Sequence, residues 1–116
     1  MGTIDINSEN LIDSFIDDSW LEKGLSKNTL SAYRHDIISF SNWYKGSSLL
    51  DVSRGDLLDY LATRLNEGYS GRSTARSLSS LRAFYSHLTI KHNLVQNPTS
   101  KVDSPKLGQS LPKTLS

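Results

Sequence analysis

The side chains best suited to chemistry in this sequence are cationic and hydroxyl groups on one face of a predicted helix, residues 70–92. At 100° per residue, Arg72, Arg76 and Ser79 fall on one side, and the segment contains no Asp or Glu. Guanidinium and hydroxyl donors on such a face can contact the phosphates of a nucleic acid. For this helix alone, an ordinary solvated face is the simpler interpretation.

A second set of donors opens the helix that is predicted to follow Ser26. A helix N-terminus presents unpaired backbone N–H groups and the positive end of the helix dipole, so it can hold a phosphate. Plain capping chemistry explains the same residue types, and both interpretations stay open. The polar residues near this helix start are Lys27, Asn28, Thr29, Ser31, Arg34 and His35.

Other kinds of chemistry find no support in the sequence. Cysteine is absent, which excludes disulfides, a thiolate nucleophile and Cys-based zinc sites. The three histidines have no metal-ligand spacing and are interpreted as isolated surface residues, and the adjacent Asp17 and Asp18 diverge by about 100° on a helix. No phosphate-binding glycine loop or nucleophile elbow occurs. We therefore expect no catalytic residue, metal, cofactor or small-molecule ligand.

Charge is distributed unevenly along the 116 residues, although the net charge is only +1. Residues 1–25 carry six acids and one base, whereas residues 70–92 carry four bases and no acid. This asymmetry can orient a small domain in the field of a polyanion. No signal sequence and no apolar run of membrane-spanning length is present, so we expect a cytoplasmic protein without a membrane partner.

Apolar residues at helical spacing predict four helices. The first runs from Asn7 or Ser8 to about Lys23, and the second from a Ser26 cap to Tyr44 or Lys45. The third starts at the S-x-x-D signal of Ser53 and ends before Gly68, and the fourth is capped by Ser70 or Ser73. The predicted buried stripes are Leu11, Ile12, Phe15, Ile16 and Trp20; Leu30, Tyr33, Ile37, Phe40 and Tyr44; Leu57, Leu58, Leu61 and Leu65; and Leu78, Leu81, Tyr85 and Leu88.

Four amphipathic helices joined by short connections predict one all-α bundle. We expect a flexible leader over residues 1–7 and the four-helix domain over residues 8–93. Residues 94–116 contain Pro98, Pro105 and Pro112 among Ser, Lys and Gly, which argues for a linker.

Several segments together resemble the N-terminal core-binding domain of the XerC/XerD tyrosine recombinases, a SAM-like domain related to phage integrases. They cover nearly the whole chain in the family's order. The most specific are NTLSAYRHD at residues 28–36 and SPKLGQSLPK at residues 104–113. The others are residues 15–37 as a whole, LLDYL at 57–61, RSTARSLSSLRAFY at 72–85 and Asn97-Pro98.

The resemblance implies a SAM-like orthogonal four-helix bundle that forms half of a C-shaped clamp around duplex DNA. The family's catalytic domain begins where this chain stops, so residues 94–116 would lead to an absent catalytic domain and no residue inherits a catalytic role. Implied partners are double-stranded DNA, the protein's own catalytic domain and other recombinase protomers. Gly108 departs from the proline common at that linker position.

In this family the second and fourth helices face the DNA major groove. The matching positions here are Lys27, Asn28, Thr29, Ser31, Arg34 and His35 in the second helix, and Arg72, Ser73, Arg76, Ser79, Ser80 and Arg82 in the fourth. Arg82 projects on the flank of its helix and could instead pair with an acid of another helix. With two basic helices and the resemblance combined, DNA binding becomes the favoured interpretation.

Two alternatives stay open. The chain could be a helical protein–protein interaction module whose acidic first helix binds a basic partner. The same domain could also come from a mobile-element or phage integrase.

Overall fold

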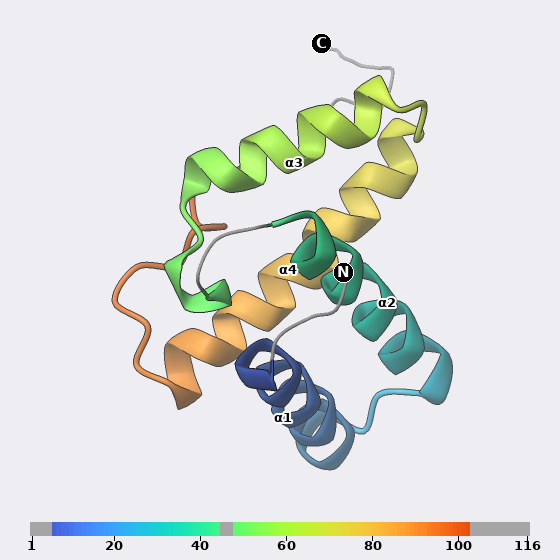
Figure 1. The fold of residues 1–116 in the computed structure, drawn as a ribbon. Coiled ribbons are helices and arrows are strands. Elements are labelled where there is room, and N and C mark those ends of the chain that lie inside the picture. The colour runs from blue at the N-terminus through green and yellow to red at the C-terminus, as the bar shows by residue number, and fades with distance from the viewer. Residues whose placement is uncertain (1–5, 45–47, 103–116) are drawn as a thin grey trace, which may run out of the picture.

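The computed structural model describes residues 6–44 and 48–102, and these residues form four α-helices without a strand. Figure 1 shows α3 across one end of the molecule, α1 at the other and α4 running between them. The predicted all-α four-helix class is confirmed. The elements are α1 (Ile6–Lys23), α2 (Lys27–Trp43), the 3₁₀ turn η1 (Leu49–Asp51), α3 (Arg54–Asn66) and α4 (Gly71–Lys91).

Local hydrogen bonds set the starts of α2, α3 and α4 where the sequence predicts them. The Ser26 hydroxyl accepts from the Thr29 backbone N–H at 3.2 Å, and Ser53 forms a full capping box with Asp56. The Ser70 hydroxyl accepts from the Ser73 N–H at 3.0 Å, so Ser70 and not Ser73 caps α4. These bonds involve residues three apart, which explains why the sequence alone reveals them.

The core is organised around α4, which packs against each of the other three helices. Its predicted stripe is confirmed, since Leu78, Leu81, Tyr85 and Leu88 are fully buried, and Phe84 joins them. The Tyr85 hydroxyl donates to the Leu49 carbonyl oxygen at 2.7 Å, which ties η1 to this core. A central helix with one buried side leaves its opposite side available to a ligand.

Two of the predicted stripes are partly wrong. In α1, Trp20 is 51% exposed because the buried face continues from Phe15 to Ser19, which is 3% exposed, and not to Trp20. In α3, Leu58 and Leu65 are exposed, and the inward positions are instead Leu57, Tyr60, Leu61 and Arg64. Tyr60, Leu61 and Arg64 follow Leu57 by three, four and seven residues, which is the spacing of one helix face. The buried face of α3 is therefore rotated from the predicted stripe toward Tyr60 and Arg64.

The helical part of the chain begins before residue 8, and the packed part ends after residue 93. The first helix starts at Ile6, within the predicted leader. After α4, Pro98, Thr99 and Val102 are buried, and the Arg82 guanidinium donates to the Val102 carbonyl oxygen. The bundle therefore includes residues up to Val102. Residues 1–5 and 103–116, which hold the rest of the predicted leader and linker, lie outside the described residues.

Candidate nucleic-acid interface

The predicted donors of α2 lie mostly on its open side. Thr29 and Arg34 are half-buried, and Arg34 donates to the Asp13 carboxylate of α1 at 2.7 Å. The remaining four, which are exposed, are Lys27, Asn28, Ser31 and His35. The start of α2 thus presents a solvent-exposed polar face, as the sequence predicts.

The predicted donors of α4 divide into an outward and an inward group. Arg72, Arg76 and Ser79 are exposed, whereas Ser73 is half-buried and accepts a hydrogen bond from Arg64 at 2.8 Å. Ser80 is buried.

Ser80 therefore needs correcting as a direct DNA contact, because its position on the inner side of α4 keeps its hydroxyl from a groove. Arg82 needs the same correction. It is half-buried, and its guanidinium donates to the Val102 backbone rather than to the acid that the sequence suggested. Ser80 joins α4 to Asp36 of α2, and Arg82 joins α4 to the segment that follows it.

A buried carboxylate that the sequence analysis missed joins the two helices. Asp36 of α2 has a side chain only 2% exposed. Its Oδ1 accepts from Arg76 Nη2 at 2.7 Å, and its Oδ2 accepts from the Ser80 hydroxyl at 2.7 Å. Asp36 lies three residues after Tyr33 and one before Ile37, beside the apolar stripe of α2. This position is the sequence signal that could have identified it as a residue near the helix contact.

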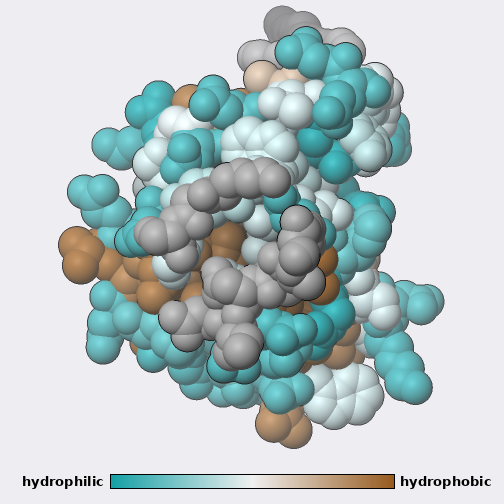
Figure 2. Space-filling view, in the orientation of Figure 1, coloured by the Kyte–Doolittle hydropathy of each residue, from teal (hydrophilic) through white to brown (hydrophobic). Residues whose placement is uncertain are grey.

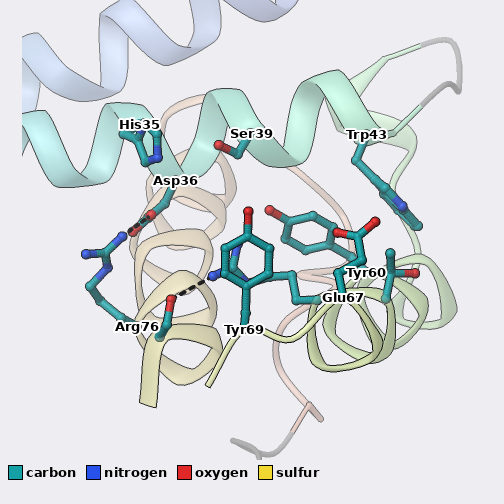
Figure 3. Close-up of a pocket in the computed structure, with 11 residues that line it drawn as sticks. His35, Asp36, Ser39, Trp43, Tyr60, Glu67, Tyr69 and Arg76 are labelled. Carbon is teal, nitrogen blue, oxygen red and sulfur yellow. Dashed lines mark hydrogen bonds and ion pairs between the residues drawn. The ribbon is translucent and has the colours of Figure 1, made fainter. Parts of the chain in front are cut away.

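A polar cleft of about 240 Å³ opens where α2, α3 and α4 meet. Figure 3 shows Arg76 reaching from α4 to Asp36, with His35 beside that pair and Tyr60, Tyr69 and Trp43 along the rest of the cleft. Since His35 and Arg76 both line this cleft, it connects the exposed faces of α2 and α4. The structure thus brings the central members of the two predicted sets together.

Arg64 forms the inner part of this cleft and was interpreted from sequence as part of a purely structural helix. Arg64 is 9% exposed, and its Cζ lies 4.1 Å from the centre of the Tyr69 ring. Its Nη2 donates to the Ser73 hydroxyl, while its Nε has no partner among the described residues. Burial raises the pKa of the nearby Tyr60, and the Arg64 guanidinium opposes that shift. Arg64 ties α3 and the Tyr69 turn to the first turn of α4.

Asp18 and Glu22, near the end of α1, face a different part of the bundle. The His87 ring bonds to the Asp18 carboxylate at 2.7 Å, and Lys91 pairs with Glu22 at 3.0 Å. The hydrogen bond from His87 lowers the pKa of Asp18. His87 is mostly buried against Phe15, so its interpretation as a surface histidine is wrong. Lys91 at the end of α4 is thus paired with an acid, whereas Lys27 and Arg72 have no ion pair among the described residues.

Within residues 6–44 and 48–102, no three His, Asp or Glu side chains gather as metal ligands. In the same part of the chain, no helix combines the length and apolar character needed to cross a membrane.

Comparison with known proteins gives a consistent result. The family model described as phage integrase, N-terminal SAM-like domain, matches residues 12–92. The tyrosine recombinase XerD of Pseudomonas aeruginosa is 49% identical over 108 residues, and that of Pseudomonas putida is 50% identical over the same length. Each alignment covers 91% of this chain and 36% of the relative. The XerD of Proteus mirabilis is 45% identical over 119 residues, covering 98% of this chain and 38% of the relative.

The chain thus spans little more than a third of the length of these relatives. No solved structure matches it significantly.

Proposed function

Because the chain belongs to the family of phage integrase N-terminal SAM-like domains, we propose that it binds duplex DNA through α2 and α4 as the core-binding domain of a site-specific tyrosine recombinase. The relatives named tyrosine recombinase XerD favour a chromosomal recombinase over a mobile-element integrase. Strand cleavage and joining belong, in this proposal, to the longer protein, and no residue of this chain carries them.

The observation that supports DNA binding most directly is the arrangement of cations at the α2–α4 cleft. Lys27, Arg72 and Arg76 are exposed on the two helices, and His35 and Arg76 line the cleft that joins them. Phosphate contacts from mobile cations supply most of the affinity of such an interface, and contacts in the groove supply sequence preference. Arg34 adds a further cation beside the α2 start and, among the described residues, is paired only with the half-exposed Asp13.

The domain division follows from the same proposal. Residues 8–93 with the packed segment up to Val102 form the DNA-binding unit, and residues 103–116 lead to a catalytic domain in the longer protein. Partners in that protein are the catalytic domain and other recombinase protomers.

Salt-dependent binding tests this function. The chain is titrated onto labelled duplex DNA at several salt concentrations, and log K should fall with log salt by about 0.9 per phosphate contact. A matched titration with Arg72→Ala should give a smaller dependence of log K on log salt. Arg54→Ala is the control, because it changes the net charge equally at the end of α3 remote from the cleft, and it should leave the dependence unchanged. An absence of binding even at low salt would overturn the proposal.

The second candidate, a protein-interaction module, is favoured by one surface. Trp20 and Leu21 are exposed at the end of α1, and Ile90 is exposed near the end of α4. On the face that Figure 2 shows, apolar surface lies mostly in the lower half of the molecule, and the surface over α3 is mainly hydrophilic. Tight binding of a recombinase protomer without any affinity for DNA would support this candidate instead.

A further inference from the structure

We infer that Asp36 is a positioning residue that fixes the guanidinium of Arg76, and that this fixed guanidinium reads a base edge in the DNA groove. The inference rests on the proposed function and goes beyond it by assigning one contact to sequence preference and a buried acid to its support. It begins from an acid that cannot itself touch DNA, because its side chain is 2% exposed.

The two bonds to Asp36 leave its carboxylate little freedom. Arg76 donates to one oxygen and Ser80 to the other, both at 2.7 Å. An enclosed carboxylate without a cation is strongly disfavoured, so the acid retains Arg76 at the line of contact between α2 and α4. Arg76 can leave this position only by leaving a buried carboxylate without its cation.

The other side of the Arg76 guanidinium stays open. Its side chain is 56% exposed, and only its Nη2 is hydrogen-bonded to the described part of the protein. A guanidinium carries five N–H donors in a rigid plane, which matches the two acceptors on the major-groove edge of guanine. Since the side chain is already ordered, binding costs less conformational entropy than it would for a free arginine.

The remaining cations at the interface differ in this respect. Lys27 and Arg72 are exposed and have no ion pair among the described residues. Mobile side chains of this kind adapt to phosphates, whose positions depend little on sequence. A fixed arginine among mobile cations is therefore the member best suited to discriminate between bases.

The role of Asp36 can be tested because a charge role and a positioning role predict different effects on base preference. Asp36→Asn removes a negative charge next to the interface, so a charge-only role predicts equal or tighter binding with unchanged preference. A positioning role predicts that preference is lost while affinity for arbitrary duplex is retained or raised.

The experiment selects bound duplexes from a pool with a randomised centre and compares wild type with Asp36→Asn. Wild type should favour guanine at one base pair by about tenfold, the size expected of one good bidentate contact. In Asp36→Asn this preference should fall to about twofold or less, and Arg76→Lys should lose it while keeping the salt dependence. Asp36→Asn should have no further effect in the Arg76→Lys background.

Asp13→Asn is the matched control, since it makes the same change at an arginine pair of the same length on α1 and α2. It should leave the guanine preference intact. If Asp36→Asn does not fold, Ser80→Ala loosens the same carboxylate from the other side while retaining its charge, and it should reduce the preference by a smaller factor.

Preference retained in Asp36→Asn or, if that variant is unfolded, in Ser80→Ala would overturn the inference. A wild-type chain that binds every duplex equally would also overturn it and leave the proposed DNA binding intact. If the wild-type chain binds no duplex at all, the proposed function itself fails.

Discussion

Two arginine–aspartate pairs join α2 to its neighbours, and they differ in burial rather than in length. Both nitrogen–oxygen distances are 2.7 Å, but the Asp13 side chain is 50% exposed and that of Asp36 is 2% exposed. Water can replace the partner of an exposed carboxylate at small cost, but it cannot reach an enclosed one. The same residue types thus make an adaptable contact on one side of α2 and a fixed one on the other.

The largest expected effect is on folding stability. Arg76→Ala leaves the Asp36 carboxylate buried without its cation and should lower the free energy of unfolding by about 3 kcal/mol. Arg34→Ala removes an exposed pair and should cost less than about 1 kcal/mol. Urea denaturation at neutral pH measures both. Similar losses in the two variants would refute the distinction, and Asp36→Asn added to Arg76→Ala should recover part of the larger loss.

A third arginine sharpens the comparison because it is buried without any carboxylate partner among the described residues. Arg64 is held by the Ser73 hydroxyl and the Tyr69 ring, so Arg64→Ala should cost about 1–2 kcal/mol. Arg64→Met keeps the aliphatic packing and should cost less. The exposed Arg72→Ala serves as the control and should stay within about 0.5 kcal/mol of wild type in the same urea series. An Arg64→Ala variant as stable as Arg72→Ala would show that these contacts contribute nothing.

The sequence predicted the local contacts of this domain but not the long-range ones. The caps at Ser26, Ser53 and Ser70 were predictable because each bond lies within one helical turn. The exposed donors of α2 and α4 followed from helical periodicity in the same way.

Periodicity places Asp36 beside the apolar stripe of α2, but it does not predict that Asp36 or Arg64 is buried, because a charged side chain is normally placed outside. The partner of Asp36 lies 40 residues away and that of Arg64 lies nine residues away, across a turn. Only the packing of α2, α3 and α4 brings these groups together. The exposure of Trp20 has the same cause, since it depends on which face of α1 the other helices leave uncovered.

The contact between Asp18 of α1 and His87 of α4 should make the stability of the domain depend on pH in the acid range. The hydrogen bond from His87 lowers the pKa of Asp18 in the folded state below its ordinary value of about 3.9. Its stabilising contribution is therefore present above that value and is lost as the pH falls through the lowered pKa. Asp18→Asn should flatten the acid limb of a urea-midpoint profile between about pH 5 and pH 2.

Asp59→Asn is the control for that profile, because Asp59 is exposed on α3 and takes part in no ion pair of the described residues. Its acid limb should run parallel to that of wild type. If Asp18→Asn also runs parallel, the contact between α1 and α4 through His87 contributes nothing to acid stability.

The smallest expected effect is on the salt dependence of DNA binding, in which the Arg34–Asp13 pair should differ from the Arg76–Asp36 pair. Because the Arg34–Asp13 pair is exposed, Arg34 can exchange its carboxylate for a phosphate, and Arg34→Ala should reduce the salt slope of DNA binding by about 0.9. Arg76→Lys keeps its charge and should leave the slope unchanged. Arg54→Ala, at the end of α3 remote from the cleft, is matched to Arg34→Ala in net charge and should also leave it unchanged. A slope equally reduced by Arg34→Ala and Arg54→Ala would mean that DNA responds to net charge alone, and the adaptable role of the exposed pair would then be wrong.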